Sequence, residues 1–572
     1  MFLKSLTIKN FRCFDRKGIK LNLNKGLTAF IGRNGSGKTA ILEALNFLIG
    51  RDYLPTRISE KDFNYGAKGI KDEIFIEGET ASPFFITIKL RSNYGRLETV
   101  IIPCNKIRLT IRRRESPEKV LDDPFVITKH VLPIIGKVDE IIYKEKETAR
   151  KALQVSKLEG GYRVDFRLKS GEVRNAKIID YQLIYNPSRV TNFPKSYYLT
   201  TNRENDASGN YSLIAKILTD LNWKYQKKRK KDSQDSIENE YKKLAASLRD
   251  TVDEKSALIN AINEKIKTIC SDNKNFQIDF IDIDQPYKSA FITKTEGDKL
   301  LLPDNLGSGF NILIAYALFN YVAGQEKMPI VLIVDEPELH LHSDWQQKMY
   351  NVFSDQKDMQ IVYSTQSENF ISLKNWQQIR SITNAQIFPQ EEFLNEKIKA
   401  TDGEEGSLSD FLDDYAKRNL HISLILKENL RLFFARKCIL VEGPSEKYAL
   451  PKLLNLINCD LSLYSVSIIP VWGKTKIKIY QTICRVFNID YFTVFDQDKT
   501  EGKQEDENAA IENNIKGENI VKFSTSFEKL FGISKDDEFQ KLVKKIDDTT
   551  NIDLINPEIK TAIEDIKKFI ES

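Results

Sequence analysis

The segment GRNGSGKT at residues 32–39 constrains the fold of this chain more than any other feature. It matches the pattern G-x-x-x-x-G-K-[ST], and it lies between a strand-like apolar run and a helical pattern. The glycines let backbone N–H groups curl around phosphate oxygens, and the N-terminus of the helix directs its positive dipole at them. We therefore predict an ATP-binding P-loop, in which Lys38 reaches the β- and γ-phosphates and the Thr39 hydroxyl is a ligand of Mg²⁺. The expected ATP site is completed by the loop residues Asn34, Gly35, Ser36 and Gly37.

A second segment, VLIVDEPELHLH at 331–342, supplies the acids that such a loop needs. Its apolar strand ends in Asp335, which can hold Mg²⁺ through water, and Glu336, which can polarise the attacking water. His340 and His342 form an H-x-H pair, but such side chains share a face only on a strand. No third ligand is evident, so a subunit-interface loop is favoured over a metal site.

Composition limits the class of protein. A chain of 572 residues predicts about three or four domains. Lys and Arg (86) barely exceed Asp and Glu (81), so the charge balance predicts no nucleic-acid partner by itself. The six cysteines show no C-x-x-C spacing, which argues against a zinc site or disulfides and for a reducing compartment. No run approaches the roughly 20 apolar residues of a membrane span, so we expect a soluble, cytoplasmic protein.

The pattern of apolar residues divides the chain into sections. Short strand-like runs dominate from about 70 to 200, and from about 205 the residues become helix-forming, with little Gly or Pro. Short apolar strands then alternate with helices, which favours an α/β core. The predicted sections are an N-terminal part of an ATPase head (1–204), a helical insertion (205–272), a C-terminal part of the head (273–400), a linker (401–425) and a second α/β domain (426–572).

Acidic residues follow two apolar strands of the last section. KCILV (437–441) leads directly into Glu442, and Glu446 follows after a Gly-Pro break. YFTVFDQDK (491–499) ends in Asp496 and Asp498. If the strands are parallel neighbours, Glu442 and both Asp side chains meet at one sheet edge, where mutual repulsion requires hard cations such as Mg²⁺ or Mn²⁺. Two such ions about 4 Å apart can support phosphodiester cleavage.

Several of these motifs resemble known families. E-G followed by D-x-D, with VWGK (471–474) between them, resembles the Toprim fold. LGSGF (306–310) resembles the signature loop of ABC-type ATPase heads, and IKNFRCF near the N-terminus resembles the SMC-like, RecF-like branch of those heads. In this order the motifs resemble the OLD (overcoming lysogenization defect) nuclease family over nearly the full length. The implied fold class is α/β: an ABC-type P-loop ATPase head with a helical dimerisation insertion, followed by a Rossmann-like Toprim domain.

The resemblance to ABC-type heads implies roles for residues of the ATPase. Ser308 and Gly309 would close over ATP held by a second copy, and Arg12 would approach the nucleotide phosphates. Gln366 stands where such heads usually have a γ-phosphate-sensing His. An amide carries no charge and cannot titrate, so slow hydrolysis or an ATP-binding switch is expected.

The resemblance to OLD nucleases also implies a metal site and its ligands. Glu442 would be the first ligand, Glu446 a further acid and Asp496 with Asp498 the central pair, and Glu528 stands where a later acidic motif is expected. A downstream lysine that stabilises transition-state charge is also implied, and the sequence leaves six candidates: Lys541, Lys544, Lys545, Lys560, Lys567 and Lys568.

The leading hypothesis is an ATP-regulated, metal-dependent DNA endonuclease in bacterial anti-phage defence. It would act as a homodimer or tetramer, with a possible second defence protein such as a helicase or reverse transcriptase. One alternative is a RecF-like DNA-repair clamp with a non-cleaving Toprim domain, and another is an RNA-directed nuclease. The basic runs KKRKK (227–231) and RRR (112–114) are either solvated surfaces or contacts to the nucleic-acid backbone, and no base-reading module is evident.

Overall fold

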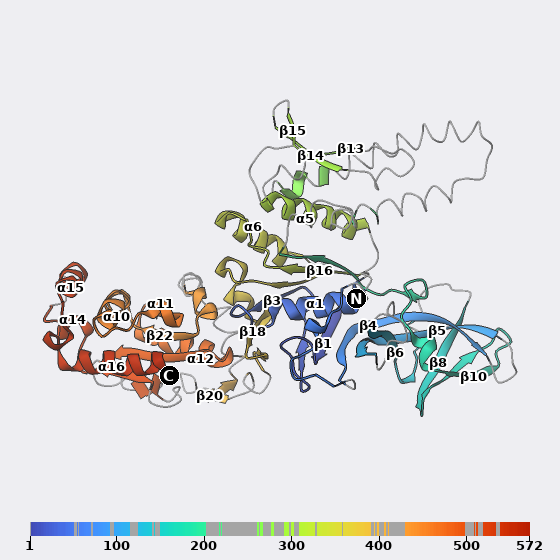
Figure 1. Ribbon diagram of the computed structural model, residues 1–572, viewed down its shortest axis with the longest axis horizontal. Helices are drawn as coiled ribbons and strands as arrows, with labels where there is room; N and C mark the ends of the chain where they lie inside the picture. Colours follow the sequence, from blue (N-terminus) through green and yellow to red (C-terminus); the bar gives the residue numbers. More distant parts are fainter. Residues whose placement is uncertain are drawn as a thin grey trace. The chain divides into compact units, whose positions relative to one another are not determined.

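The computed structural model places most of the ATPase and Toprim sections. It describes residues 2–50, 57–69, 72–91, 97–114, 124–139, 149–201, 276–279, 291–296, 299–301, 308–325, 329–356, 359–390, 397–399, 405–407, 429–497, 519–533 and 538–572, with isolated positions at 54, 142, 217, 219, 260–261, 263–266, 394, 410, 508–509 and 511–512. The chain divides into two compact units, residues 1–29 with 37–365 and residues 30–36 with 366–572. Figure 1 shows both units in sequence colours.

The first unit contains a large, mainly antiparallel sheet. Its strand order is β10-β9-β8-β5-β4-β1-β2. The longest strand, β4, and the second half of β5 alternate buried and more exposed residues, as a sheet with one face on a core requires. This confirms the predicted strand-rich section. The strands are β1 (Leu3–Lys9), β2 (Ile19–Asn22), β4 (Ile74–Arg91), β5 (Leu97–Arg113), β6 (Phe125–Pro133), β7 (Gly136–Lys137), β8 (Arg150–Leu158), β9 (Gly161–Arg167), β10 (Val173–Ile178) and β11 (Val190–Thr191).

A second sheet in this unit positions the predicted ATP site. Its strands β12 (Lys195–Leu199), β16 (Ile330–Asp335) and β17 (Gln360–Ser364) are parallel neighbours. β3 (Leu27–Ile31) follows β17 in the strand order. Every residue of β3, β16 and β17 is buried, which explains why these strands are continuous apolar runs. The main helices are α1 (Lys38–Ile49), α5 (Ser308–Gln325) and α6 (Ser343–Ser354).

The Gln360 side chain connects the two sheets of the first unit. Its Oε1 accepts a hydrogen bond from Leu3 N–H at 2.9 Å, and its Nε2 donates to Leu3 O at 2.8 Å. Because Gln360 is 2% exposed, these bonds satisfy a buried amide and fix the start of β1 beside β17.

The second unit contains a parallel sheet with the order β23-β22-β24-β25. Its strands are β22 (Lys437–Val441), β23 (Val466–Pro470), β24 (Asp490–Asp496) and β25 (Ile520–Phe523). Helices α10 (Pro444–Leu456), α11 (Leu461–Tyr464), α12 (Ile477–Val486), α14 (Phe527–Leu530), α15 (Glu538–Asp547) and α16 (Pro557–Glu571) belong to the same region. One hydrophobic core joins α10, α15 and α16 to β22 and β24, so the predicted second α/β domain has its own core.

Smaller elements complete the described residues. Short strands form the antiparallel pairs β18 (Ile379–Thr383) with β19 (Gln386–Phe388) and β20 (Lys397–Lys399) with β21 (Glu405–Ser407), and the three-stranded set β13 (Phe276–Asp279), β14 (Phe291–Glu296) and β15 (Lys299–Leu301). The 3₁₀ helices are η2 (Glu60–Asp62), η4 (Asp180–Leu183), η6 (Glu368–Phe370), η7 (Leu373–Gln378), η8 (Leu430–Phe434), η9 (Lys474–Lys476) and η10 (Ile552–Leu554).

Parts of the sequence predictions lie outside the described residues. The helical insertion is described only at a few helical positions near 217 and 260–266, and the KKRKK run is not among them. α5 begins at Ser308, within the predicted signature loop. None of the helices in the described part of the chain is long and apolar enough to cross a membrane. The predicted domain boundaries therefore stay predictions.

Candidate nucleotide and metal sites

The predicted P-loop has the backbone conformation that its glycines allow. Gly35 has φ 77° and Gly37 has φ 109°, both in the left-handed region. A Cβ atom on Gly37 would lie 2.7 Å from Cys13 Sγ and 3.0 Å from the Phe14 ring, so this position also lacks room for a side chain. α1 begins at Lys38, as predicted. Ser36 Oγ is buried with no hydrogen-bond partner among the described residues, which suits a polar ligand at the loop.

Lys38 lies within electrostatic reach of the predicted Mg²⁺-binding acids. Its side chain is buried. Burial lowers the pKa of the Lys38 ammonium, and the carboxylates of Glu336, Asp335 and Glu338 oppose that shift. The structure therefore brings together the cation of one predicted motif and the acids of the other, although they are about three hundred residues apart in the sequence.

Ser364, at the end of β17, positions the acidic pair. Its Oγ donates a hydrogen bond to Asp335 Oδ1 and accepts the Glu336 N–H at 3.1 Å. Glu336 has φ 49°, an uncommon conformation for a residue other than glycine, and a bond from its N–H to the Ser364 carbonyl supports it. The next residue, Thr365, donates to Glu338 Oε2 at 2.9 Å. The sequence prediction considered this stretch only for Gln366, which is exposed.

Replacing Ser364 by Ala is expected to lower the kcat of ATP hydrolysis by about tenfold, because the buried Asp335 loses a donor that orients it. The fold should survive, since the Glu336 N–H keeps its bond to the Ser364 carbonyl. Steady-state ATPase kinetics check this, with the partly exposed Ser354→Ala variant in α6 as the matched control. Equal kcat values for both variants would contradict a positioning role.

Arg12 is held by two acids of the first unit. Its guanidinium forms ion pairs with Glu43 of α1 and, at 3.0 Å, with Asp62. Burial raises the pKa of Glu43, and Arg12 opposes that shift. Arg12 itself has φ 50°, stabilised by a bond from its N–H to the Asp62 carbonyl. These contacts fix the loop beside Gly37, while an Arg12 contact with nucleotide stays a prediction.

The C-terminal acids meet at one edge of the parallel sheet. β22 and β24 are neighbours, with Val441 opposite Val494, so both strands end on the same side. The Asp496 N–H lies 3.4 Å from Glu442 Oε2. Glu446 Oε2 accepts the Gly443 N–H at 3.0 Å, where α10 begins. This confirms that the two strands are parallel neighbours, while Asp498 lies outside the described residues.

The buried position of these acids disfavours their charged forms. Burial raises the pKa of Asp496 to about 8, and Glu446 and Glu442 add to the shift. Burial also raises the pKa of Glu446 to about 7, with further contributions from Glu442 and Glu528. Asp496 Oδ2 accepts the Phe527 N–H at 3.3 Å, whereas the buried Asp496 Oδ1 has no partner among the described residues. A buried oxygen without a donor, facing further carboxylates, fits a divalent cation.

The complete ligand set stays a prediction. Within the described part of the chain, no three His, Cys, Asp or Glu side chains are close enough together to hold a metal ion. Glu442 and Asp496 would therefore need a further ligand, and the sequence offers Asp498 and Glu528 as candidates. Glu528, in α14, contributes to the electrostatic field at Asp496.

Metal-free protein is expected to lose stability as the pH rises from 6 to 8. The folded state holds a proton on Asp496 up to about pH 8, whereas an unfolded aspartate loses its proton near pH 4. Between these values the folded state binds more protons, so raising the pH destabilises it. We expect the melting temperature in EDTA to fall by roughly 2–4 °C over this pH range. Millimolar Mg²⁺ should raise the melting temperature more at pH 8 than at pH 6. An Asp496→Asn variant with the same pH dependence and Mg²⁺ response would contradict this explanation.

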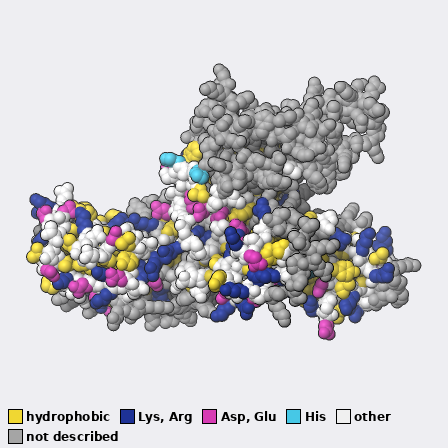
Figure 2. All heavy atoms as spheres, in the orientation of Figure 1, with side chains coloured by type: hydrophobic (Ala, Val, Ile, Leu, Met, Phe, Trp, Pro, Cys, Tyr) yellow, Lys and Arg dark blue, Asp and Glu magenta, His cyan; other side chains and the backbone are white. Residues whose placement is uncertain are grey.

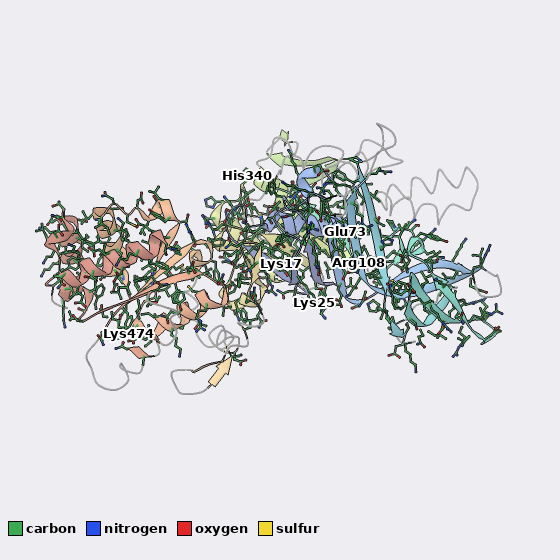
Figure 3. All side chains as sticks on the ribbon, turned by 60° about the horizontal axis from the view of Figure 1, so that its bottom comes forward. Lys17, Lys25, Glu73, Arg108, His340 and Lys474 are labelled. Atoms are coloured by element: carbon green, nitrogen blue, oxygen red, sulfur yellow. The ribbon has the colours of Figure 1, made fainter. Side chains whose placement is uncertain are left out.

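Lys474 is a site residue that the sequence prediction missed. It lies in η9, is buried, and donates from Nζ to the Asp496 carbonyl at 2.7 Å (Figure 3). The signal in the sequence is the lysine that directly follows the glycine of VWGK (471–474). Several downstream candidates have other partners: Lys545 bonds Phe531 O, Lys560 pairs with Asp553 at 2.6 Å, Lys567 bonds Ile457 O at 2.9 Å and Lys568 pairs with Asp565 at 2.9 Å.

Other sequence candidates do not form sites in the described residues. His340 and His342 are exposed, and His342 Nδ1 lies 3.8 Å from the Asp344 carboxylate. Of the RRR run, Arg112 pairs with Glu73 at 2.6 Å and Arg113 with Glu60 at 3.0 Å. On the face visible in Figure 2, the coloured Lys and Arg side chains are interspersed with Asp and Glu.

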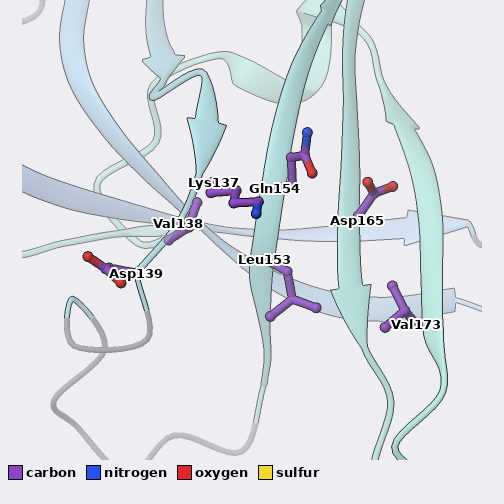
Figure 4. Close-up of a pocket in the computed structure, with 7 residues that line it drawn as sticks. All are labelled: Lys137, Val138, Asp139, Leu153, Gln154, Asp165 and Val173. Atoms are coloured by element: carbon purple, nitrogen blue, oxygen red, sulfur yellow. The ribbon is translucent and has the colours of Figure 1, made fainter.

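A hollow of about 600 Å³ lies in the large antiparallel sheet of the first unit (Figure 4). It is formed by β7 to β10 and contains none of the residues predicted for the ATP or metal sites. Its lining residues are Lys137, Val138, Asp139, Leu153, Gln154, Asp165 and Val173.

A P-loop facing a buried acidic strand end, together with a separate parallel sheet that carries acids at its carboxyl edge, defines a P-loop ATPase with a Toprim-type domain. The chain belongs to the family described as AAA ATPase domain, whose model matches residues 1–371. Residues 433–498 match the model described as overcoming lysogenization defect protein-like, TOPRIM domain. The OLD-type arrangement predicted from the sequence is confirmed.

Two relatives match most of the chain, and a third matches a short part of it. The OLD nuclease of Thermus scotoductus is 24% identical over 532 residues, covering 89% of this chain and 86% of its own length. Endonuclease GajA of Bacillus cereus is 23% identical over 484 residues, covering 83% of this chain and 71% of its own. The DNA replication and repair protein RecF of Streptococcus gordonii is 40% identical over 83 residues, covering 14% of this chain and 22% of its own.

Proposed function

We propose that this protein is an ATP-regulated, divalent-metal-dependent DNA endonuclease. The observation that supports this most strongly is the buried Asp496 Oδ1, which has no partner among the described residues and lies beside Glu442 at a shared strand edge. The relatives named OLD nuclease and endonuclease GajA match most of the chain, including the region of these acids.

At the nuclease site, Glu442 and Asp496 would hold Mg²⁺ or Mn²⁺ together with Asp498. The cation supplies Lewis-acid chemistry at the scissile phosphate. Glu446 adds negative charge to the cluster, and Lys474 fixes the Asp496 backbone through its carbonyl. These residues would set the position of the metal-binding acids relative to the scissile phosphate. That position decides whether the nucleophile can attack the phosphorus opposite the leaving oxygen.

At the ATPase site, Lys38 would bind the β- and γ-phosphates while Thr39 and Asp335 hold Mg²⁺. Glu336 would polarise the attacking water, with Ser364 fixing its backbone. Ser308 and Gly309 of a second copy would complete the site, so turnover requires at least a homodimer. The nucleotide state would then control access of DNA to the acids, and a role in anti-phage defence follows from the OLD resemblance.

A RecF-like clamp is the second candidate. The match to RecF over 83 residues favours it. In that case ATP would drive DNA binding without cleavage, and the acids of the Toprim sheet would serve no catalytic role.

A cleavage assay distinguishes these functions. Purified protein is incubated with supercoiled plasmid, linear duplex, single-stranded DNA or single-stranded RNA, with Mg²⁺ or Mn²⁺ and with or without ATP. The endonuclease proposal predicts DNA cleavage that EDTA abolishes. DNA-stimulated ATP hydrolysis with intact substrates would support the clamp, and cleavage confined to RNA would support the RNA-directed alternative.

A further inference from the structure

An exposed tryptophan lies directly beside the candidate metal site. Trp472 follows β23, and the residues on either side of it are hydrogen-bonded to the end of β22. The Val471 N–H donates to the Val441 carbonyl at 2.9 Å, and the Gly473 N–H donates to the Glu442 carbonyl at 2.9 Å. These bonds fix the Trp472 backbone next to the Glu442 peptide. The Trp472 side chain is nevertheless 45% exposed, an unusual fraction for a large aromatic residue in such a constrained turn.

The backbone at Trp472 does not favour a tryptophan. Its φ is 59°, in the left-handed region, which is strained for a bulky side chain and free of strain for glycine. Lys476 Nζ stabilises the turn by donating to the Trp472 carbonyl at 2.8 Å. Because the turn would form more easily with glycine and the indole is only partly covered, folding does not explain this side chain. Strained residues of this kind concentrate at binding sites.

The surroundings of Trp472 indicate what it binds. Lys474 and Lys476 follow it in η9, and Glu442 and Asp496 lie at the adjoining strand ends. Lys474 is buried on the Asp496 carbonyl, so the partly exposed Lys476 is the lysine that can attract a phosphate here. An exposed aromatic ring beside it is a stacking surface for bases. A duplex hides the faces of its bases, whereas a single strand exposes them, so an aromatic platform favours unpaired nucleotides.

We propose that Trp472 stacks against an unpaired base of the strand that is cut, next to the scissile phosphate. The inference rests on the proposed nuclease function and gives it a substrate preference: single-stranded or locally unpaired nucleic acid. Trp472 acts as a positioning residue, because it holds the strand while the acids and their cation act on the phosphate.

The test measures binding separately from cleavage. Equilibrium binding of a short single-stranded DNA is measured in EDTA for the wild type and for Trp472→Ala, Trp472→Gly and Trp472→Phe, with the exposed Leu463→Ala variant in α11 as the control. Loss of stacking is expected to weaken binding about tenfold in the Ala and Gly variants, with Phe retaining most of the affinity. Leu463→Ala should bind like the wild type. Trp472→Gly should melt at or above the wild-type temperature, which excludes loss of fold as the cause.

Two further measurements distinguish stacking by Trp472 from a purely structural role of this residue. Single-stranded DNA should quench the tryptophan fluorescence of the wild type. The quenching that comes from Trp472 should be absent in Trp472→Phe. In a series of oligonucleotides, each with one abasic site at a different position, one position should abolish the difference in affinity between the wild type and Trp472→Ala. That oligonucleotide lacks the base that stacks on Trp472. In the cleavage assay, Trp472→Ala should raise KM for single-stranded DNA about tenfold and change kcat little.

The outcomes separate this inference from the proposed function. Unchanged affinity and quenching in all three Trp472 variants would overturn the stacking inference, even if the protein cuts DNA. Weakened binding with lost quenching would support stacking in a protein that cuts nothing, and the nuclease proposal alone would then fail.

Discussion

Asp496→Asn is expected to reduce metal-dependent DNA cleavage by more than about 10²-fold, because changes to residues that merely orient metal ligands already cost about 10–100-fold. The amide keeps the size of the side chain and can still accept the Phe527 N–H through its oxygen. It cannot ionise, so it cannot supply the negative charge that binds a cation beside Glu442 and Glu446. Initial rates of plasmid nicking with Mn²⁺ provide the measurement.

Asp490→Asn is the matched control for this experiment. Asp490 is exposed at the opposite end of the same strand, so the variant makes the same chemical change far from the acidic edge. Its nicking rate should remain within about twofold of the wild type, as for ordinary surface substitutions. Nicking by Asp496→Asn at the rate of Asp490→Asn would show that cleavage does not depend on this carboxylate.

Lys38→Ala is expected to lower ATP hydrolysis by at least about 10²-fold, because the protein loses the charge that stabilises the transferring phosphoryl group. The wild-type lysine is buried beside Asp335 and Glu336, so the variant also removes the positive charge of the ammonium group beside these acids. Nucleotide-free nicking with Mn²⁺ should persist, since the proposed nuclease acids belong to the other unit.

The control is Lys25→Ala, an exposed lysine of the first unit that Figure 3 labels with Lys17. It should hydrolyse ATP like the wild type. ATP hydrolysis by Lys38→Ala at the wild-type rate would contradict the assignment of the P-loop. Loss of nucleotide-free nicking in Lys38→Ala, with its melting temperature unchanged, would show that the Lys38 side chain is needed for cleavage even when no ATP is bound.

The sequence predicted those parts of both sites that depend on short, local motifs. The P-loop could be predicted because the eight residues GRNGSGKT contain both the glycines that set its backbone conformation and the first residues of α1. The acids Asp335, Glu442 and Asp496 could be predicted because each ends, or directly follows, a mostly apolar strand. The carboxyl ends of parallel strands share one edge of a sheet, so the pairing of β22 with β24 was sufficient to bring Glu442 and Asp496 together.

The residues that position those acids could not be predicted in the same way. Ser364 reaches Asp335 only because β17 pairs with β16 in the register that places these two residues opposite each other. Lys474 reaches the Asp496 carbonyl only through the turn that follows β23. Neither residue belongs to a motif that fixes its partner, since each contact joins separate strands through tertiary structure. The left-handed backbone of Trp472 likewise has no signature in the letters VWGK.

Mn²⁺ binding to nucleotide-free protein, followed by electron paramagnetic resonance, tests the central claim most directly. The claim is that Glu442, Asp496 and Asp498 hold one divalent-cation site that cuts phosphodiesters. The account predicts a Mn²⁺ site in the wild type and in Lys38→Ala, and its loss in Glu442→Gln, Asp496→Asn and Asp498→Asn, with nicking lost in the same three variants. Wild-type Mn²⁺ affinity in all three acid variants would contradict it.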